Sequence, residues 1–258
     1  MSEAEEYLRL ASVDNFRDVA GPEPGYATAD GGRLRTGVFY RSNDLQLTEE
    51  DHGLLARVGL HTVIDLRTAP EVALHPDPAL PGAELVHLDA SGIPMEELAA
   101  LDHRDDAQAV MAQVYRSFVT HPKSLSAFGA VLTRLADGGP QLFHCSAGKD
   151  RTGWVAALLL HLAGVDDATI EADYLLTNAR TARSRARTEA QIAEHLGREK
   201  VAVFAPALVA DVAYLHAALD EVEASYGDRR GYLRDGLGLG EDVLERLRTL
   251  LRVEPGQP

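Results

Sequence analysis

Residues 142–154, LFHCSAGKDRTGW, contain the single cysteine of a 258-residue chain. The run QLFHC, 141–145, follows the turn DGGP and predicts a β-strand that ends at Cys145. Residues 152–164 are apolar on nearly all sides and predict a buried helix that ends at Gly164. A loop between the end of a strand and the start of a helix is where parallel sheets bind ligands.

The loop between these two elements has the composition of an anion site. Ser146, Ala147 and Gly148 are small, so their backbone N–H groups can converge on one point. The following helix adds its unpaired N–H groups and positive end. Arg151 can grip two oxygens with its planar fork. The same charges favour the thiolate of Cys145, so the loop predicts a cysteine nucleophile facing a bound phosphate.

Each of these residues also has an ordinary structural interpretation. A lone cysteine after a strand is most often a core residue, and an arginine at a helix start is most often solvated. The sequence GKDRT also resembles a nucleotide-binding P-loop. That motif needs a glycine where this chain has Phe143, and a serine or threonine where it has Asp150. The combined pattern therefore favours the cysteine site.

Working outward from the loop, strands alternate with helices through the first two thirds of the chain. Strands are predicted at 38–41, 62–66 and 84–90, and helices at 47–59 (with Thr48 as N-cap), 106–119 and 122–136. Residues 166–252 are almost entirely helical in pattern. We therefore expect an α/β fold with a mostly parallel sheet, helices on both faces and a helical C-terminal third.

Composition and charge exclude several classes of function. No apolar run reaches 18 residues, so no membrane-spanning segment is predicted. The net charge of −15 disfavours nucleic-acid binding. A single cysteine fits a reducing compartment, and the acidic N-terminus does not resemble a signal peptide. A cytoplasmic location is the expectation, with export that needs no signal peptide as the alternative. The oligomeric state is left open.

The segment HCSAGKDRTG, 144–153, resembles the H-C-x5-R-[ST] loop of cysteine-dependent protein tyrosine phosphatases, in the bacterial tyrosine/lipid phosphatase branch. Other segments resemble that branch in the same order: NFRDVAG (15–21), GVFYRSNDL (37–45), VIDLRTAPE (63–71), DYLLTNA (173–179) and YGDRRGYLRDGLGL (226–239). The resemblance implies one phosphatase domain over 1–258 with a protein tyrosine phosphatase-like fold. It also implies hydrolysis of phosphotyrosine proteins, or of phosphoinositides, without metal or other cofactor.

The resemblance also assigns roles within the loop. Cys145 is expected to attack phosphorus and form a phosphocysteine, which water then hydrolyses, and Arg151 to stabilise the transition state. Thr152 is expected to stabilise the leaving thiolate, and His144 to orient the loop. The substrate-binding residues are then Ser146, Ala147, Gly148, Lys149 and Thr152.

The general acid is less constrained. The Trp-Pro-Asp pattern of many tyrosine phosphatases is absent, because the only tryptophan, Trp154, follows the loop. Asp150 is the first candidate, since it lies within the loop and matches the lipid-phosphatase branch. Asp89, near the end of the strand 84–90, is the second, and Asp102 is the third. The alternative for Asp150 is a structural ion pair with Lys149 or Arg151.

Other charged residues are predicted to support the fold. Asp65, Arg67 and Glu71 are expected to form an ion-pair network, and Arg17, Asp18 and Arg41 to fix the N-terminal segment. Within 178–197, four arginines occur in eight residues with no acid among them: Arg180, Arg183, Arg185 and Arg187. Residues 178–205 are expected to form a basic lid that attracts phosphorylated substrates, with a solvated helix paired to acids elsewhere as the alternative.

Two other functions fit parts of the pattern. A phosphate-binding module without catalysis would have the same cradle but would not need the thiol of Cys145. A sulfurtransferase also uses a cysteine before a helix but would not need Arg151 and Thr152 at this spacing. The sequence therefore favours a phosphomonoester hydrolase.

Overall fold

The computed structural model describes residues 9–253. Residues 1–8, which carry most of the acidic stretch considered for a signal peptide, lie outside the described residues, as do 254–258. Five strands form one sheet in the order β1-β3-β6-β4-β5. They are β1 (Arg17–Asp18), β3 (Phe39–Ser42), β4 (Thr62–Asp65), β5 (Glu84–His87) and β6 (Gln141–His144). All neighbours are parallel except β1 and β3, so the predicted mostly parallel sheet is confirmed.

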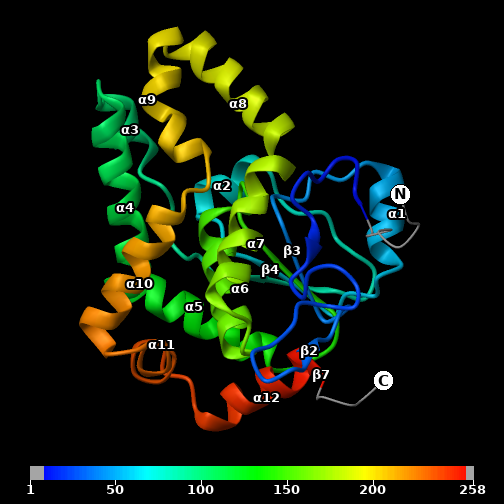
Figure 1. Cartoon of the computed structure of the whole chain (residues 1–258). Helices are drawn as coiled ribbons and strands as arrows, with labels where there is room; N and C mark the ends of the chain where they lie inside the picture. Colours follow the sequence, from blue (N-terminus) through cyan, green and yellow to red (C-terminus); the bar gives the residue numbers. More distant parts are fainter. Residues whose placement is uncertain (1–8, 254–258) are drawn as a thin grey trace.

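The two faces of the sheet are covered unequally. Ile64 and Phe143 point into a large core, whereas their neighbours Val63 and Leu142 point into a small one, as the period of two in a strand requires. The small core is closed by α1 (Glu49–Ala56), visible alone at the right of Figure 1, and by the N-terminal segment. The large core holds α4 (Arg104–Thr120), α5 (Pro122–Leu135) and α6 (Asp150–Leu162). The shorter helix α2 (Ala69–Leu74) lies between β4 and β5 in the sequence, and α3 (Met95–Ala100) lies between β5 and α4.

Several boundaries differ from the predicted ones. Helix α1 is capped by Thr48, whose side chain accepts a hydrogen bond from the Asp51 backbone, as expected. Strand β5 ends at His87 rather than at residue 90. Helix α6 begins at Asp150, two residues before the predicted start, because the first turn includes Asp150 and Arg151. Its buried character is confirmed, since residues 150–160 are all buried.

The C-terminal third is helical, as predicted. It contains α7 (Asp167–Arg180), α8 (Ala182–His195), α9 (Arg198–Leu208), α10 (Val212–Tyr226), α11 (Arg229–Gly231), the π-helix η1 (Tyr232–Gly236) and α12 (Glu241–Leu251). It ends in β7 (Arg252–Val253), which pairs with β2 (Arg33–Leu34) in a second, two-stranded sheet. The sequence did not predict this pair, since two residues are too short for a detectable alternating pattern.

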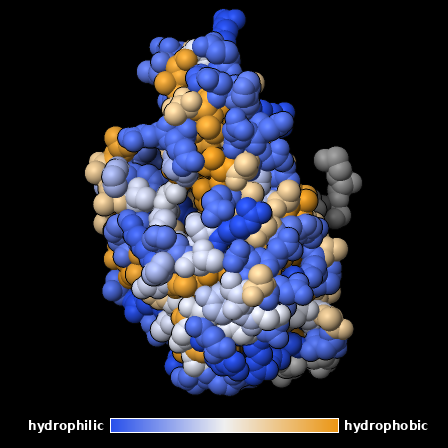
Figure 2. All heavy atoms as spheres, turned by 90° about the vertical axis from the view of Figure 1, so that its left-hand side faces the viewer, coloured by the Kyte–Doolittle hydropathy of each residue, from blue (hydrophilic) through white to orange (hydrophobic). Residues whose placement is uncertain are grey.

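Helices α8 and α9 form an arm that projects from the body of the molecule (Figure 1). Apolar surface runs down this arm on the side shown in Figure 2, and Leu196 at its tip and Met95 in α3 are exposed apolar side chains. Within residues 9–253, no single helix is long and apolar enough to cross a membrane. Only α9 and α10 taken together, across a 48° bend, reach that length and composition.

Candidate active site

The loop that follows β6 lies at the carboxyl end of the central strands. Strand β6 runs parallel to both β3 and β4, and Cys145 is the first residue after it. Helix α6 begins five residues later at Asp150. The expected order of strand, cysteine loop and helix is therefore present. The loop lies at the carboxyl ends of the strands, where ligands bind in such folds.

The carbonyl groups of the loop are held by residues outside it. The Ser146 carbonyl accepts from the Asp44 backbone N–H at 3.2 Å. The Gly148 carbonyl accepts from Asn15 Nδ2 at 2.8 Å and from Arg41 Nη2 at 3.0 Å. In the described part of the chain, the backbone N–H groups of residues 146–150 have no hydrogen-bond acceptor. A ring of donors with its carbonyls turned away is the cradle that an oxyanion requires.

Gly148 is the loop position that requires glycine. Its φ is +65°, and a Cβ there would lie 2.4 Å from the backbone oxygen of Ser42. A side chain would therefore either strain the backbone or push the loop away from β3. Close approach to β3 also places Gly148 within reach of Arg41.

Arg151 is fixed by a carboxylate from α2. Its Nη1 and Nη2 donate to the two oxygens of Glu71 at 2.8 and 2.9 Å, and Nη1 also donates to the Leu66 carbonyl at 3.2 Å. A guanidinium has five N–H donors. The edge formed by Nε and the second N–H of Nη2 therefore remains for two oxygens of a phosphate. Ser146 also donates to Glu71, at 2.5 Å.

The electrostatics of this pair favour ionised forms. Burial alone would raise the pKa of Glu71, but hydrogen bonds and charge from Arg151 lower it to about 2. Burial opposes the charge on Arg151, yet the negative charges of Cys145 and Glu71 raise the pKa of Arg151 further. The pair contributes stability that is fully present above the unfolded pKa of Glu71, near 4.5, and is lost as the pH falls toward 2.

Glu71 does not belong to the ion-pair network that was predicted for it. Asp65 and Arg67 form the predicted ion pair, with Arg67 donating to both Asp65 oxygens at 2.9 and 2.8 Å. Glu71 does not join them, because it faces Arg151 instead. The third carboxylate of the Arg67 network is Asp77, at 2.8 Å, which the sequence analysis missed.

His144 is tied to the same network. Its Nε2 lies 2.8 Å from Asp77 Oδ2 and 3.9 Å from Asp65 Oδ1. These three side chains are close enough to hold a metal ion. The guanidinium of Arg67, however, already donates to both carboxylates, and its positive charge would repel a cation. The arrangement therefore fits an ion-pair network that anchors the residue before Cys145.

A second network joins the N-terminal segment to α7. Arg17 and Arg41 both bind Asp173, at 3.1 and 2.8 Å, and all three are buried. Burial and the neighbouring Arg17 lower the pKa of Arg41 to about 10. Arg41 also holds the Gly148 carbonyl, so these residues support the cysteine loop as well as the N-terminal segment. Asp18 is separate, accepting from the backbone of Gly37 and Ala20.

The floor of the cradle contains two buried groups. Cys145 is 2% exposed, and a negative charge on its sulfur would interact with Arg151 and Arg41. The hydroxyl of Thr152 is buried and has no hydrogen-bond partner among the described residues. This hydroxyl is an unused donor in the first turn of α6, two residues after the helix start.

Lys149 Nζ and Asp150 Oδ1 contact groups from other helices. Lys149 Nζ donates to the carbonyls of Ala207 and Val209, at 2.8 and 3.0 Å, where α9 ends. It also lies 3.3 Å from Asp150 Oδ1, which accepts from the Tyr115 hydroxyl at 2.9 Å. Lys149 is expected from the sequence to bind substrate, and for that its bonds to the carbonyls at the end of α9 would have to break.

The other two candidate acids have different partners. Asp89 lies just beyond β5 and forms an ion pair with Lys123 at 2.8 Å. Its neighbour Ala90 donates to the Leu66 carbonyl, the same oxygen that Arg151 contacts. Asp102 is 82% exposed and pairs with Lys200 of α9 at 3.1 Å. Of the three, Asp150 is the one within the loop–helix junction.

The arginines of α8 have acidic partners after all. Arg183 pairs with Asp14, and Arg187 lies 4.0 Å from the same carboxylate. Arg185 lies 3.8 Å from Glu189. Asp14 is nearly buried and also accepts from the Ser184 backbone, so it ties the start of α8 to the N-terminal segment. Arg183 and Arg187 nevertheless remain 60% and 67% exposed.

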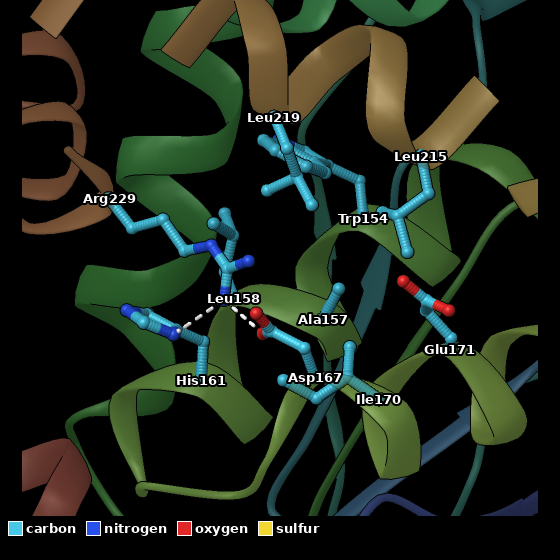
Figure 3. Close-up of a pocket in the computed structure, with 10 residues that line it drawn as sticks. All are labelled: Trp154, Ala157, Leu158, His161, Asp167, Ile170, Glu171, Leu215, Leu219 and Arg229. Atoms are coloured by element: carbon cyan, nitrogen blue, oxygen red, sulfur yellow. Dashed lines mark hydrogen bonds and ion pairs between the residues drawn. The ribbon is translucent and has the colours of Figure 1, made fainter. Parts of the chain in front are cut away.

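A separate hollow lies along the distal part of α6 (Figure 3). Apolar side chains from α6, α7 and α10 line it, among them Leu158, Ile170 and Leu215. Arg229 reaches across one side, between His161 at 2.8 Å and Asp167 at 2.5 Å. None of the residues predicted to act in catalysis lines this hollow.

Several residues of the site were not predicted as functional. Asn15, Asp173 and Tyr174 lie in segments that carried the family resemblance, NFRDVAG and DYLLTNA, so the signal was present but unassigned. Tyr115 and Asp77 had no such signal. They reach the loop from α4 and from the segment after α2, and only the tertiary structure brings them there.

The fold and the site together define a cysteine-dependent phosphatase: a thiol at the end of a central strand, a ring of backbone donors and an arginine fork. A sequence model described as "Tyrosine phosphatase family" matches residues 8–253. The chain therefore belongs to the tyrosine phosphatase family and is a protein tyrosine phosphatase.

Three relatives of 30% identity or more agree with this assignment. The triple specificity protein phosphatase PtpB of Mycobacterium tuberculosis is 34% identical, over 94% of this chain and 98% of that protein. A putative tyrosine-protein phosphatase of Cupriavidus necator is 33% identical, over 89% and 84%. A tyrosine-protein phosphatase of Nostoc commune is 31% identical, over 83% and 74%. The crystal structure of TpbA from P. aeruginosa aligns with a TM-score of 0.32 at 18% identity, over 59% of this chain and 80% of that one.

Proposed function

We propose that residues 1–258 form one phosphatase domain that cleaves phosphate monoesters through a phosphocysteine on Cys145. The observation that carries this proposal is the buried Cys145 beneath unpaired backbone N–H groups, next to an arginine whose free edge can hold two phosphate oxygens. Cys145 attacks phosphorus in line with the departing oxygen, Arg151 binds the equatorial oxygens, and Asp150 protonates the leaving group. Water then attacks the phosphocysteine and gives its proton to the Asp150 carboxylate, and the thiolate departs toward the hydroxyl of Thr152.

Asp150 is the best-placed general acid because it begins α6, one residue before Arg151. Its side chain is buried, and Oδ1 accepts from the Tyr115 hydroxyl and lies 3.3 Å from Lys149 Nζ. Asp89 and Asp102 lie outside this loop–helix junction and pair with Lys123 and Lys200. The position of Asp150 at this junction, next to Arg151, supports it over the other two.

The assignment is tested with aryl phosphates of graded leaving-group strength, assayed with a metal chelator present. Wild-type enzyme should hydrolyse both p-nitrophenyl phosphate and phenyl phosphate. Asp150→Asn should lower kcat/KM for phenyl phosphate by about 10²–10³-fold, and for p-nitrophenyl phosphate by much less, because a good leaving group needs little protonation. Asp89→Asn is the matched control and should lower both rates equally or not at all. Equal losses for Asp150→Asn on the two substrates would contradict the acid role.

For substrate range, we extend the proposal to phosphoinositides in addition to phosphotyrosine proteins. The name of PtpB indicates that a relative at 34% identity acts on three kinds of substrate. Arg183 and Arg187 are exposed on α8, within the expected lid at 178–205, and share one face of the helix. An inositol ring with several phosphates would gain more from these charges than a phosphotyrosine would.

The combined variant Arg183→Ala, Arg187→Ala should therefore lower kcat/KM for phosphoinositides by about 3–10-fold, since exposed charge contacts are worth up to ~1 kcal/mol each. The rate on p-nitrophenyl phosphate should not change, and the phosphoinositide effect should shrink as salt is added.

A matched control is Arg230→Ala, Arg234→Ala, which removes two exposed arginines of α11 and η1 that also have acidic partners. If this control lowers phosphoinositide turnover as much as the α8 variant does, net charge and not the lid explains the effect. No change for the α8 variant would identify α8 as a solvated face.

A further inference from the structure

A chain of buried hydroxyl groups ends on Asp150. The Tyr115 hydroxyl of α4 lies 2.9 Å from Asp150 Oδ1 and 2.6 Å from the Tyr174 hydroxyl of α7. Both tyrosines are at most 1% exposed. One chain of hydrogen bonds therefore joins side chains of three helices, α4, α6 and α7. A buried hydroxyl at this distance is costly unless its hydrogen bond is made, so the contact constrains all three side chains.

The protonation of the two tyrosines sets the direction of the hydrogen bonds. Burial, and then the negative charge of Asp150, raise the pKa of Tyr115 well above its ordinary value. Burial and Asp150 likewise raise the pKa of Tyr174. Both hydroxyls therefore keep their single hydrogen. Tyr115 donates its hydrogen to Asp150, so Tyr174 must donate to Tyr115.

The two oxygens of Asp150 consequently differ. Oδ1 accepts from Tyr115 and faces Lys149 Nζ at 3.3 Å. Oδ2 has no hydrogen-bond partner among residues 9–253. A proton on Oδ1 would displace a donor hydrogen and face a positive charge, whereas a proton on Oδ2 displaces nothing. Oδ2 is therefore the oxygen from which Asp150 can donate a proton.

We propose that Tyr115 is a positioning residue for the general acid, which fixes the Asp150 carboxyl through Oδ1 so that Oδ2 presents the proton to the leaving group. This inference rests on the role proposed above for Asp150. Tyr115 is itself held firmly: its ring packs against Phe118 and Tyr214, with centroids 5.0 and 5.8 Å away, and edge-on against Tyr174. Tyr115 does not contact the reacting atoms and acts through Asp150.

The test is Tyr115→Phe, which removes one oxygen and keeps the ring. We expect kcat for phenyl phosphate to fall about tenfold, the effect of one lost hydrogen bond to a charged group, while KM stays unchanged. The rate on p-nitrophenyl phosphate should fall less than about twofold. The basic limb of the pH–rate profile for phenyl phosphate should move to higher pH, because the ionised carboxyl loses a donor.

A matched control is Tyr232→Phe. Tyr232 is equally buried, and its hydroxyl donates to the Phe118 carbonyl and accepts from Trp154 Nε1. The substitution therefore removes the same hydroxyl oxygen from a buried tyrosine that does not bond to Asp150. This variant should leave the ratio of the two rates unchanged. If Tyr115→Phe does not fold, as judged by its melting curve, Tyr174→Phe replaces it and should show the same selective loss to a smaller degree.

A double-mutant cycle separates the inference from the role of Asp150. In the Asp150→Asn background, Tyr115→Phe should cause no further selective loss on phenyl phosphate. Should Asp150→Asn show no leaving-group selectivity, the acid assignment itself is wrong. If Asp150→Asn is selective but Tyr115→Phe lowers both substrates equally, or acts undiminished without Asp150, then Tyr115 has only a structural role and the inference is overturned.

Discussion

Cys145→Ser should reduce turnover of p-nitrophenyl phosphate to below about one per cent of wild type, because a serine hydroxyl is not ionised at neutral pH and cannot replace the thiolate as nucleophile. Binding of inorganic phosphate, measured by calorimetry, should persist. The backbone N–H groups of the loop and Arg151, which bind the phosphate, remain in place in this variant. Serine also fills nearly the same volume as cysteine at this buried position.

The single cysteine makes this experiment unusually direct. Rapid quenching of wild-type enzyme during turnover should yield a phosphorylated chain, and peptide mass spectrometry should place the phosphate on Cys145, the one thiol present. Residual turnover above about one per cent, or a phosphoenzyme in the serine variant, would show that another group attacks phosphorus.

Arg151→Lys should lower kcat/KM for p-nitrophenyl phosphate by about 10²–10³-fold, the usual cost of losing a main donor to a transition-state oxyanion. A lysine retains the charge but cannot hold Glu71 with one edge and two phosphate oxygens with the other. The loss should lie mainly in kcat, since the charge still attracts phosphate in the ground state.

Glu71→Gln tests the support of Arg151 with a milder change. It keeps an acceptor for Arg151 but removes the charge that fixes the guanidinium, so we expect an intermediate loss. Asp65→Asn, which neutralises the separate Arg67 network, is the matched control for a lost buried ion pair. If Arg151→Lys retains more than about a tenth of wild-type activity, a bidentate grip on the phosphate is not part of catalysis.

The local chemistry of the site could be predicted from the amino-acid sequence. Cys145 and Arg151 are six positions apart, and strand, small-residue loop and helix dictate most of their relative placement. Such short-range geometry follows from backbone preferences, so the cradle, the buried α6 and the Thr48 cap of α1 could be predicted from residue types. The alternation of strands and helices likewise indicated the mostly parallel sheet.

The tertiary structure decided which residues hold that chemistry in place. Glu71 meets Arg151 across 80 positions of sequence, Arg41 meets Gly148 across 107, and Tyr115 meets Asp150 across 35. No periodic pattern marks such partners, because a buried carboxylate or hydroxyl finds its partner only when separate elements pack together. Glu71 therefore looked like a member of the Asp65–Arg67 network until the path of α2 turned it toward Arg151, where burial makes pairing of the two charges obligatory.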